Sequence, residues 1–334
     1  MRRGSVFLVL LGAFFLTLAP LSRFYVADRL VVVPLDFYQS VTLTADDASY
    51  YDRVTGKVHE GVELGANMAI RGDIRAGDGK TAVWDAMLDI HKGKDPIAMV
   101  SYRMALDRHT SELTTSHGAT IDQVAVPQSG YGPIFPVANV HRKTYQIFDM
   151  MTQRTWPAVF QGTERVEGVF TYRFVQKVEP TLLATSKKLV DPQAVGLPKT
   201  HKPVKVGRYH EANITIWVDP RTGLPIKEQQ QVNSTLRAAN GAEGTFVKAD
   251  LVTEAKDQKA LAKSSNDYAR QIALVRTVLP GVSLFLGLVL LALGGTVALF
   301  LPVRTRRPQA VMEPVPVGSP DEMAASQASS GRRP

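Results

Sequence analysis

Apolar residues are concentrated near the two ends of the chain, and between them they recur in short alternating runs. Residues 5–21 form a 17-residue stretch without a charge, and residues 278–303 form a second one of 26 residues. The second stretch exceeds the roughly 20 residues that a helix needs to cross a bilayer, which predicts a transmembrane helix. The first follows two arginines, a layout shared by cleaved signal peptides and retained signal anchors.

The residues around the two candidate cleavage positions favour retention of the first stretch. A cut after Ala19 leaves Pro20 first in the mature chain, and a cut after Ala27 requires Tyr25 where a small residue is expected. We therefore expect residues 1–23 to form a signal-anchor helix, followed by an extracytoplasmic domain at residues 24–254.

Arginines flank both predicted spans on the sides away from this domain. Arg2 and Arg3 precede the first span, and Arg304, Arg306 and Arg307 follow the second. By the positive-inside rule, we expect a two-pass plasma-membrane protein with both termini in the cytoplasm. The Pro, Ser, Ala and Gly content of residues 304–334 predicts a basic, disordered cytoplasmic tail.

The domain between the spans shows the period-two pattern of strands with one buried face. The alternating apolar positions are Phe170, Tyr172 and Phe174 in one run and Ile214, Ile216 and Val218 in another. The predicted fold class is mainly β (α+β), an antiparallel β-rich extracytoplasmic domain bracketed by N- and C-terminal transmembrane helices. Residues 255–277 change to helical spacing, which predicts a juxtamembrane amphipathic helix leading into the span at 278–303.

Asp-x-x-Thr triplets recur where strands are expected to end. The Asp side chain accepts bonds from backbone amides just downstream, and a following Gly supplies positive φ. The predicted hairpin turns contain Asp52 with Gly56, Asp107, and Asp219 with Gly223. A calcium site is the alternative, but it needs several oxygen donors at one place, and these triplets lie far apart in sequence.

An aromatic segment between residues 131 and 156 is the candidate ligand-binding region. Aromatic rings beside polar groups can bind a sugar ring or a lipid headgroup. The candidate residues are Tyr131, Phe135, Tyr145, Phe148, Asp149 and Trp156. The same pattern is also typical of a core aromatic cluster under a long loop.

Composition and charge narrow the function classes further. The chain has no cysteine, which excludes disulfides and thiolate chemistry. The net charge is +8, of which +5 lies outside residues 24–277, so the basicity belongs to the membrane flanks and we expect no nucleic-acid partner.

No motif points to a cofactor or a metal. The seven histidines are scattered, and none pairs with another at the helical i, i+4 spacing of zinc motifs. No nucleophile elbow, phosphate-binding loop or dinucleotide fingerprint is present. A glycosidase-like carboxylate pair stays open, although no acidic residue stands out and no catalytic residue is predicted.

The layout resembles the actinobacterial PorA-like family of two-span envelope proteins, which carry a porin name. The residues that carry the resemblance are the segment 2–21, LTADDASYYDRVTG, KTYQIFD, FQGTERVEGVFTYRF, WVDPRTGLPIKE and the final span. The resemblance implies an envelope protein with a suspected part in lipoglycan biogenesis. The WVDPRTGLPIKE hairpin is also similar to hairpins of periplasmic lipoprotein-carrier domains.

The main hypothesis is a non-enzymatic membrane-anchored envelope protein that binds lipid, lipoglycan or a partner enzyme and assists cell-envelope biogenesis. Its expected partners are the plasma membrane, an envelope lipid or glycan, or a membrane-bound envelope-biosynthesis enzyme. The first alternative is a porin or channel, although a porin spans with short strands and has no long apolar helix. The second alternative is an envelope hydrolase or transferase.

Overall fold

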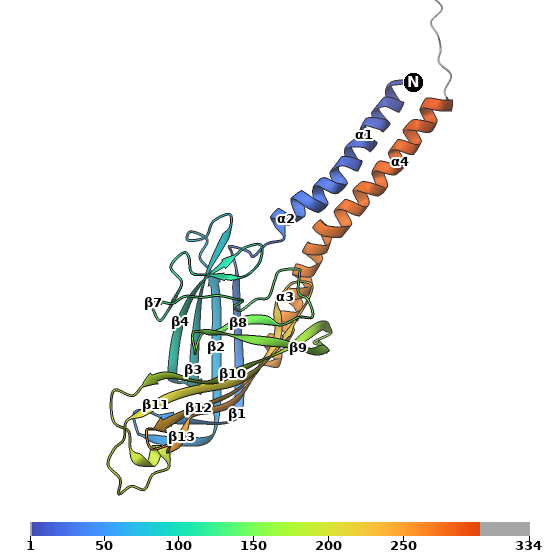
Figure 1. Cartoon of the computed structure of the whole chain (residues 1–334). Coiled ribbons are helices and arrows are strands. Elements are labelled where there is room, and N and C mark those ends of the chain that lie inside the picture. Colours follow the sequence, from blue (N-terminus) through green and yellow to red (C-terminus); the bar gives the residue numbers. More distant parts are fainter. Residues whose placement is uncertain (1, 301–334) are drawn as a thin grey trace, which may run out of the picture.

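The computed structural model describes residues 2–300, with side chains from residue 4 onward. The predicted tail at 304–334 and the last residues of the predicted span at 278–303 lie outside this range. Within it, a large antiparallel β-sheet domain carries a long apolar helix at each end, as the sequence pattern predicts (Figure 1).

All strands belong to one antiparallel sheet of 13 strands. The strands are β1 (Tyr38–Asp52), β2 (Lys57–Gly72), β3 (Thr81–Lys92), β4 (Asp95–Asp107), β5 (Leu113–Thr114), β6 (Thr120–Ile121), β7 (Val124–Ala125), β8 (Tyr145–Asp149), β9 (Arg154–Val166), β10 (Val169–Thr185), β11 (Val206–Val218), β12 (Pro225–Ala238) and β13 (Glu243–Thr253). Their order is β7-β6-β4-β3-β2-β1-β13-β12-β11-β10-β9-β8, with β5 paired to β4. The first and last long strands are therefore neighbours at the centre of the sheet.

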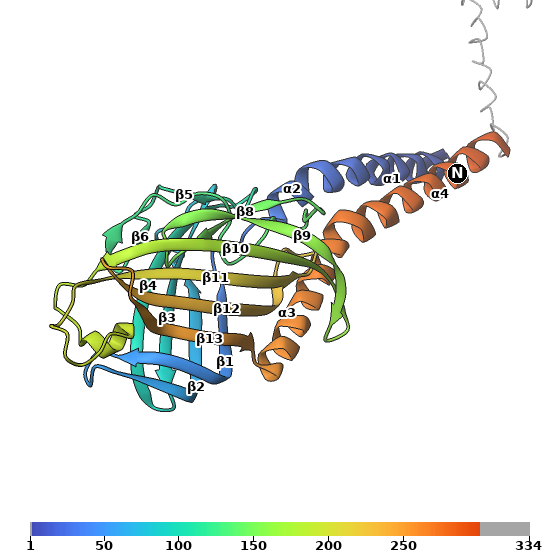
Figure 2. The same cartoon turned by 60° about the horizontal axis from the view of Figure 1, so that its bottom comes forward.

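The sheet is strongly curled, so that its β1–β4 part folds over toward its β8–β13 part (Figures 1 and 2). Its two edges are linked through Tyr131, which bridges Glu112 on one side and Ile147 on the other. The Tyr131 N–H donates to the carbonyl of Gln146 at 2.8 Å. Gly130 has a φ of 74°, in the left-handed region, and a Cβ there would collide with the same carbonyl. Only glycine fits this close approach.

Strand β10 buries residues on both of its faces near its start. Phe174 is fully buried, whereas Phe170 is 40% exposed and Thr171 is buried. Tyr172 and Phe174 pair with Val218 and Ile216 of β11, and Phe170 lies beyond the last of these pairs, which leaves it uncovered. Val169, on the opposite face, packs with Trp217 and with Leu261 of the helix that follows the sheet. The prediction of one buried face was therefore wrong for the first residues of this strand.

The face of β11 follows the prediction more closely. Ile214, Ile216 and Val218 are all buried. Trp217 points to the other face and is buried as well, because it packs with Ile226 and with Leu261 of the helix that follows the sheet. The hydrophobic effect therefore attaches this helix to β11 and β12.

Both ends of the described chain are helical. The helices are α1 (Arg2–Leu21), η1 (Ser22–Val26) and α2 (Ala27–Leu30) at the N-terminal side, and η2 (Pro192–Val195), α3 (Ala255–Ala273), η3 (Leu274–Val278) and α4 (Leu279–Phe300) further along. Residues 4–30 and 255–300 form helices long and apolar enough to cross a membrane, by length and composition. The predicted amphipathic helix runs directly into the second apolar segment through the π-helical turn η3.

Helices α1 and α4 pack side by side along their length (Figure 1). A Cβ on Gly12 would lie 2.9 Å from Leu291, and one on Gly287 would lie 2.9 Å from Leu16. The Ser5 hydroxyl donates to the carbonyl of Gly294 at 2.8 Å. Small residues at the contact and a polar bond across it are typical of helix pairs in membranes.

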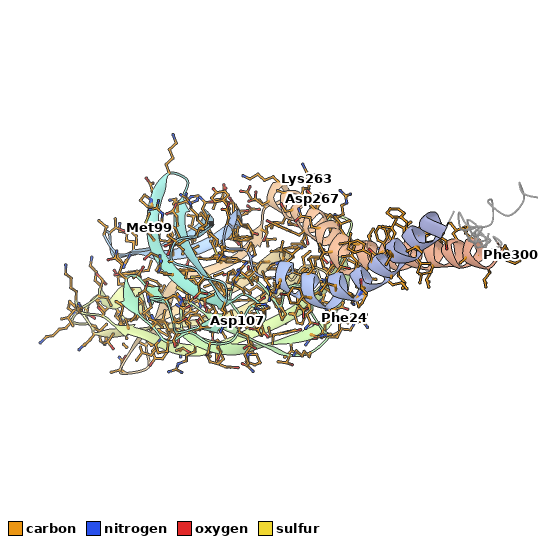
Figure 3. All side chains as sticks on the ribbon, turned by 90° about the horizontal axis from the view of Figure 1, so that it is seen from above. Phe24, Met99, Asp107, Lys263, Asp267 and Phe300 are labelled. Carbon is orange, nitrogen blue, oxygen red and sulfur yellow. The ribbon has the colours of Figure 1, made fainter. Side chains whose placement is uncertain are left out.

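Helix α3 runs past the ends of β11, β12 and β13 (Figure 2). Its buried residues are Leu261, Ala262, Ser265 and Ala269, whereas Lys263 and Asp267 lie on its outer side (Figure 3). The Asp257 carboxylate accepts a bond from the Thr42 amide of β1 at 2.7 Å. The Gln258 side-chain amide donates to the carbonyl of Thr253 in β13 at 2.7 Å, so helix α3 is tied to both central strands of the sheet.

Candidate functional site

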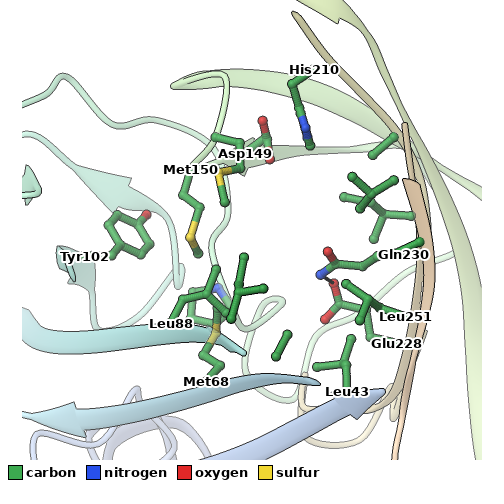
Figure 4. Close-up of a pocket in the computed structure, with 18 of the residues that line it drawn as sticks. Leu43, Met68, Leu88, Tyr102, Asp149, Met150, His210, Glu228, Gln230 and Leu251 are labelled. Atoms are coloured by element: carbon green, nitrogen blue, oxygen red, sulfur yellow. Dashed lines mark hydrogen bonds between the residues drawn. The ribbon is translucent and has the colours of Figure 1, made fainter. Parts of the chain in front are cut away.

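The curled sheet encloses an apolar cavity of about 300 Å³ (Figure 4). One wall comes from β1–β4 and the facing wall from β11–β13. Typical wall residues are Leu43, Leu64, Met68 and Leu88 on one side and Ile214, Val232 and Leu251 on the other. Met104, Met150 and Met151 also contribute, and their flexible thioethers adapt to ligands of irregular shape. This enclosed and mostly apolar space is the candidate binding site.

One carboxyl group faces this apolar space from β12. Glu228 accepts a hydrogen bond from the Gln230 side-chain amide at 2.7 Å, and both residues line the cavity (Figure 4). Removal from water raises the pKa of Glu228, and the bond from Gln230 offsets this only in part. Glu228 therefore keeps its proton to a higher pH than an exposed glutamate does, and in that form it can donate a hydrogen bond into the cavity.

A second polar group lies where β8 approaches β11. The His210 Nδ1 lies 2.8 Å from the Ser234 hydroxyl, and both side chains are buried. Burial lowers the pKa of His210, an effect that nearby Asp149 opposes and Arg208 reinforces. The Asp149 carboxylate accepts bonds from the amide and hydroxyl of Thr152, at 2.7 and 2.5 Å. His210 is thus held as a neutral imidazole beside a carboxylate that is already hydrogen-bonded.

The hydroxyl of Tyr102 also lines the cavity, and within residues 4–300 it has no hydrogen-bond partner. Burial raises its pKa, and the charge of Asp149 adds to this effect. Buried hydroxyls normally have a partner, so Tyr102 is available to a polar atom of a ligand or to water.

The two ends of the cavity differ in character. At the end near the helices, Leu261 of α3 and Phe135 of the long loop contribute to the wall. At the opposite end, the lining includes Tyr51, Arg53 and Arg208. The cavity therefore runs from an apolar end beside α3 to a basic end beside the β1–β2 turn.

The aromatic segment predicted to bind a ligand divides between the cavity and the core. Phe135, Phe148 and Asp149 line the cavity. Tyr131, Tyr145 and Trp156 belong instead to the aromatic core.

These core aromatics use their own polar groups within the protein. The Tyr131 hydroxyl donates to Glu112 at 3.1 Å, the Tyr145 hydroxyl accepts from the His141 amide at 2.8 Å, and the Trp156 indole donates to Thr152 at 3.0 Å. The segment therefore contributes some residues to the cavity wall and others to the core cluster, and ligand binding by the cavity residues stays a prediction.

The predicted turn residues all lie at strand ends. Asp52 caps the β1–β2 turn, in which Gly56 has a φ of 72°. Asp107 accepts from the amides of His109 and Thr110 where β4 ends. Asp219 caps the β11–β12 turn, in which Gly223 has a φ of 81°. These side chains hold turns, and none of them lines the cavity.

Sequence reasoning missed the polar residues of the cavity, notably His210, Glu228 and Gln230. One signal was present, because residues 227–231 read KEQQQ in the middle of the domain, with no apolar residue on either face. A strand at the centre of a sheet normally keeps one apolar face, so such a run indicates polar side chains in the interior of the domain.

Acidic and basic groups of the cavity do not assemble into a metal site. Within the described residues, no group of three or more His, Asp or Glu side chains is placed to hold a metal ion. The carboxyl groups of Asp149 and Glu228 lie on separate walls, one near His210 and the other beside Gln230 (Figure 4).

Fold and site together define a β-sheet protein with an internal apolar cavity and two apolar terminal helices. The family model described as porin PorA matches residues 4–296. The chain therefore belongs to the porin PorA family. No curated protein matches the sequence. The family's description fits the porin alternative of the sequence hypotheses better than the lipoglycan-assisting role, and with the two apolar helices it fits a membrane protein.

Proposed function

We propose that this protein is a membrane-anchored envelope protein whose sheet domain binds a lipid by enclosing an acyl chain in its cavity. The cavity itself carries the proposal, because about 300 Å³ of mostly apolar space lies inside the sheet. An apolar cavity of about 150 Å³ accepts benzene. By that standard the space here takes roughly a dozen carbon atoms of a hydrocarbon chain.

The proposal includes an orientation in the plasma membrane. Helices α1 and α4 cross the bilayer as a pair, and the sheet domain lies outside the cytoplasm with both termini inside. The length and composition of the helices support this placement, as do Arg2, Arg3 and the arginines after residue 303. The bound lipid then serves envelope assembly, through transfer to a membrane-bound biosynthetic enzyme.

A porin is the second candidate, and the family's description favours it. The sheet is an unsuitable wall for such a pore, because its outer face carries ion pairs such as Arg103 with Asp73 at 2.7 Å and with Asp85 at 2.8 Å. Strands that face lipid are apolar on the outside. A pore therefore requires several copies that assemble through their helices, and it predicts conductance in planar bilayers.

A cavity-filling variant tests the lipid proposal. Val232 lies between Ala212 and Ala249 on neighbouring strands, so Val232→Trp projects a large ring into the cavity. Gln231→Trp places the same ring on the exposed face of the same strand and is the matched control. A fluorescent fatty acid such as cis-parinaric acid is titrated into the detergent-purified full-length proteins.

We expect saturable binding to the wild type and to Gln231→Trp, and several-fold weaker binding to Val232→Trp. Absence of binding to the wild type, or equal binding to all three proteins, contradicts the proposal.

A further inference from the structure

Two arginines meet at the end of the cavity that lies away from the helices. Arg53 lies in the turn between β1 and β2. Strand β1 begins shortly after α2, so its other end, next to Arg53, lies away from the helices. Arg208 lies near the start of β11. The other end of β11 leads to the β11–β12 turn, where the Thr222 hydroxyl is bonded to Ser265 of α3. Both arginines line the cavity. Arg53 is exposed and Arg208 is half-buried, so this end combines a basic entrance with an apolar interior.

In the part of the chain that the structure describes, no carboxylate pairs with either guanidinium group. Across residues 4–300, no Asp or Glu oxygen lies within 4.0 Å of Arg53 or Arg208. The buried Nε of Arg208 has no hydrogen-bond partner in this part of the chain. Its guanidinium lies 5.1 Å from the centre of the Phe246 ring, and Arg53 makes one long contact of 3.4 Å with the carbonyl of Ile97.

The positive charges also act on each other. Burial lowers the pKa of Arg208, and the charge of Arg53 lowers it further. Two like charges at a desolvated site cost free energy unless an anion lies between them. Buried donors are normally paired, so the Arg208 Nε is available to an acceptor on a ligand.

The acidic groups near this entrance are already engaged in local turns. Asp52 accepts from the Val54 amide at 2.7 Å and from the Thr55 hydroxyl at 2.6 Å. Asp191 accepts from the Gln193 amide at 2.9 Å at the start of η2. Both are close enough to Tyr51 to contribute to its raised pKa, after burial. They hold turns and leave the two guanidinium groups free.

We propose that Arg53 and Arg208 bind the anionic headgroup of the lipid whose acyl chain fills the cavity. This inference rests on the proposed function and adds the ligand class, an anionic amphiphile with a phosphate or carboxylate group. Guanidinium groups match both anions through paired, charge-assisted hydrogen bonds. The headgroup then lies at the end of the sheet away from α1 and α4, with the chain directed toward α3.

A competition between two lipids with identical acyl chains tests the headgroup assignment. Full-length protein in detergent is incubated with equimolar phosphatidylglycerol and phosphatidylcholine, and the bound lipids are quantified by mass spectrometry. The variants are the double change Arg53→Gln with Arg208→Gln, the single change Arg53→Gln, and Arg237→Gln. Arg237 is the control because it is paired with Glu243 at 3.0 Å outside the cavity.

We expect the wild type and Arg237→Gln to favour phosphatidylglycerol about tenfold, which corresponds to about 1.4 kcal/mol. The double variant should bind both lipids equally with unchanged total lipid. Arg53 is exposed, so its single replacement preserves the fold and should lose part of the preference even where the double variant fails to fold.

Equal binding of both lipids by the wild type overturns the headgroup assignment and leaves the proposed function intact. Binding of neither lipid overturns both. A third arm adds inorganic phosphate alone. If free phosphate binds as tightly as phosphatidylglycerol, the acyl chain contributes nothing, and the site belongs to a free anion instead of a lipid.

Discussion

Replacing Asp219 with alanine should loosen α3 from the sheet. The Asp219 carboxylate is fully buried and accepts four hydrogen bonds. One comes from the Ser265 hydroxyl of α3 at 2.8 Å, and one from the backbone amide of Arg221 at 2.9 Å. The other two come from the Arg221 guanidinium, at 2.7 and 3.0 Å. The carboxylate thus connects the β11–β12 turn to the helix that leads into α4.

The loss of unfolding free energy depends on which hydrogen-bond donors to Asp219 stay buried after the change. The Arg221 side chain is 51% exposed, so water replaces its lost partner and its ion pair contributes little. Ser265 is fully buried. The bonds from Ser265 and from the Arg221 amide go to a charged acceptor, and losing each costs about 1.5 kcal/mol. The expected loss of unfolding free energy is therefore about 3 kcal/mol.

Denaturant unfolding of the full-length protein in detergent, followed by tryptophan fluorescence, measures this loss. Trp217 packs beside Leu261 of α3 and reports on the same contact. Asn266→Ala is the matched control, because Asn266 accepts only a solvent-exposed bond from Arg221 at 2.8 Å, and its loss should stay within about 0.5 kcal/mol. A loss below about 1 kcal/mol for Asp219→Ala, or one equal to that of the control, refutes the reasoning.

Three further predictions concern the cavity and the helix pair. Burial raises the pKa of Glu228 above its ordinary value of 4.5, so the folded chain holds this proton more tightly than the unfolded chain. Stability therefore falls as pH rises from about 4.5 through the folded-state pKa. Glu228→Gln should remove this fall in denaturant titrations across pH, each unit of pKa difference being worth about 1.4 kcal/mol; an unchanged pH profile contradicts it. Burial lowers the pKa of His210, so the folded chain binds this proton less tightly than the unfolded chain and loses stability as pH falls below about 6.5. His210→Gln should reduce that loss. An identical loss in both proteins argues against a buried neutral imidazole. Gly287→Leu should separate α1 from α4, because a Cβ there lies 2.9 Å from Leu16. Gly295→Leu is the control, since a Cβ on Gly295 meets nothing within 4 Å. Equal disulfide cross-linking of engineered cysteines on α1 and α4 in both variants refutes the packing.

Local features of this fold could be predicted from the sequence because short-range physics determines them. The long apolar stretches specify helices, and alternation specifies strands such as β11. Asp and Gly at fixed offsets specify the turns at Asp52 and Asp219, since the carboxylate and the positive φ act within a few residues.

The cavity could not be predicted, because inward-facing apolar residues show the same alternation whether a sheet encloses packed side chains or an empty space. Ala212, Val232 and Ala249 resemble ordinary core positions, and only the curl of the sheet leaves room beside them. Phe170 shows a second limit, since it continues the alternation but lies beyond the last pair that β10 makes with β11 and stays 40% exposed. Residues such as Arg53 and Arg208 meet through long-range topology alone.

Lipid content and conductance, measured on one preparation of the full-length protein, test the central claim most directly. The account predicts about one acyl-chain lipid per chain by mass spectrometry of the detergent-purified protein, and no conductance when the same sample is added to planar bilayers. Protein that is free of lipid and forms ion-conducting pores contradicts the account and establishes the porin reading.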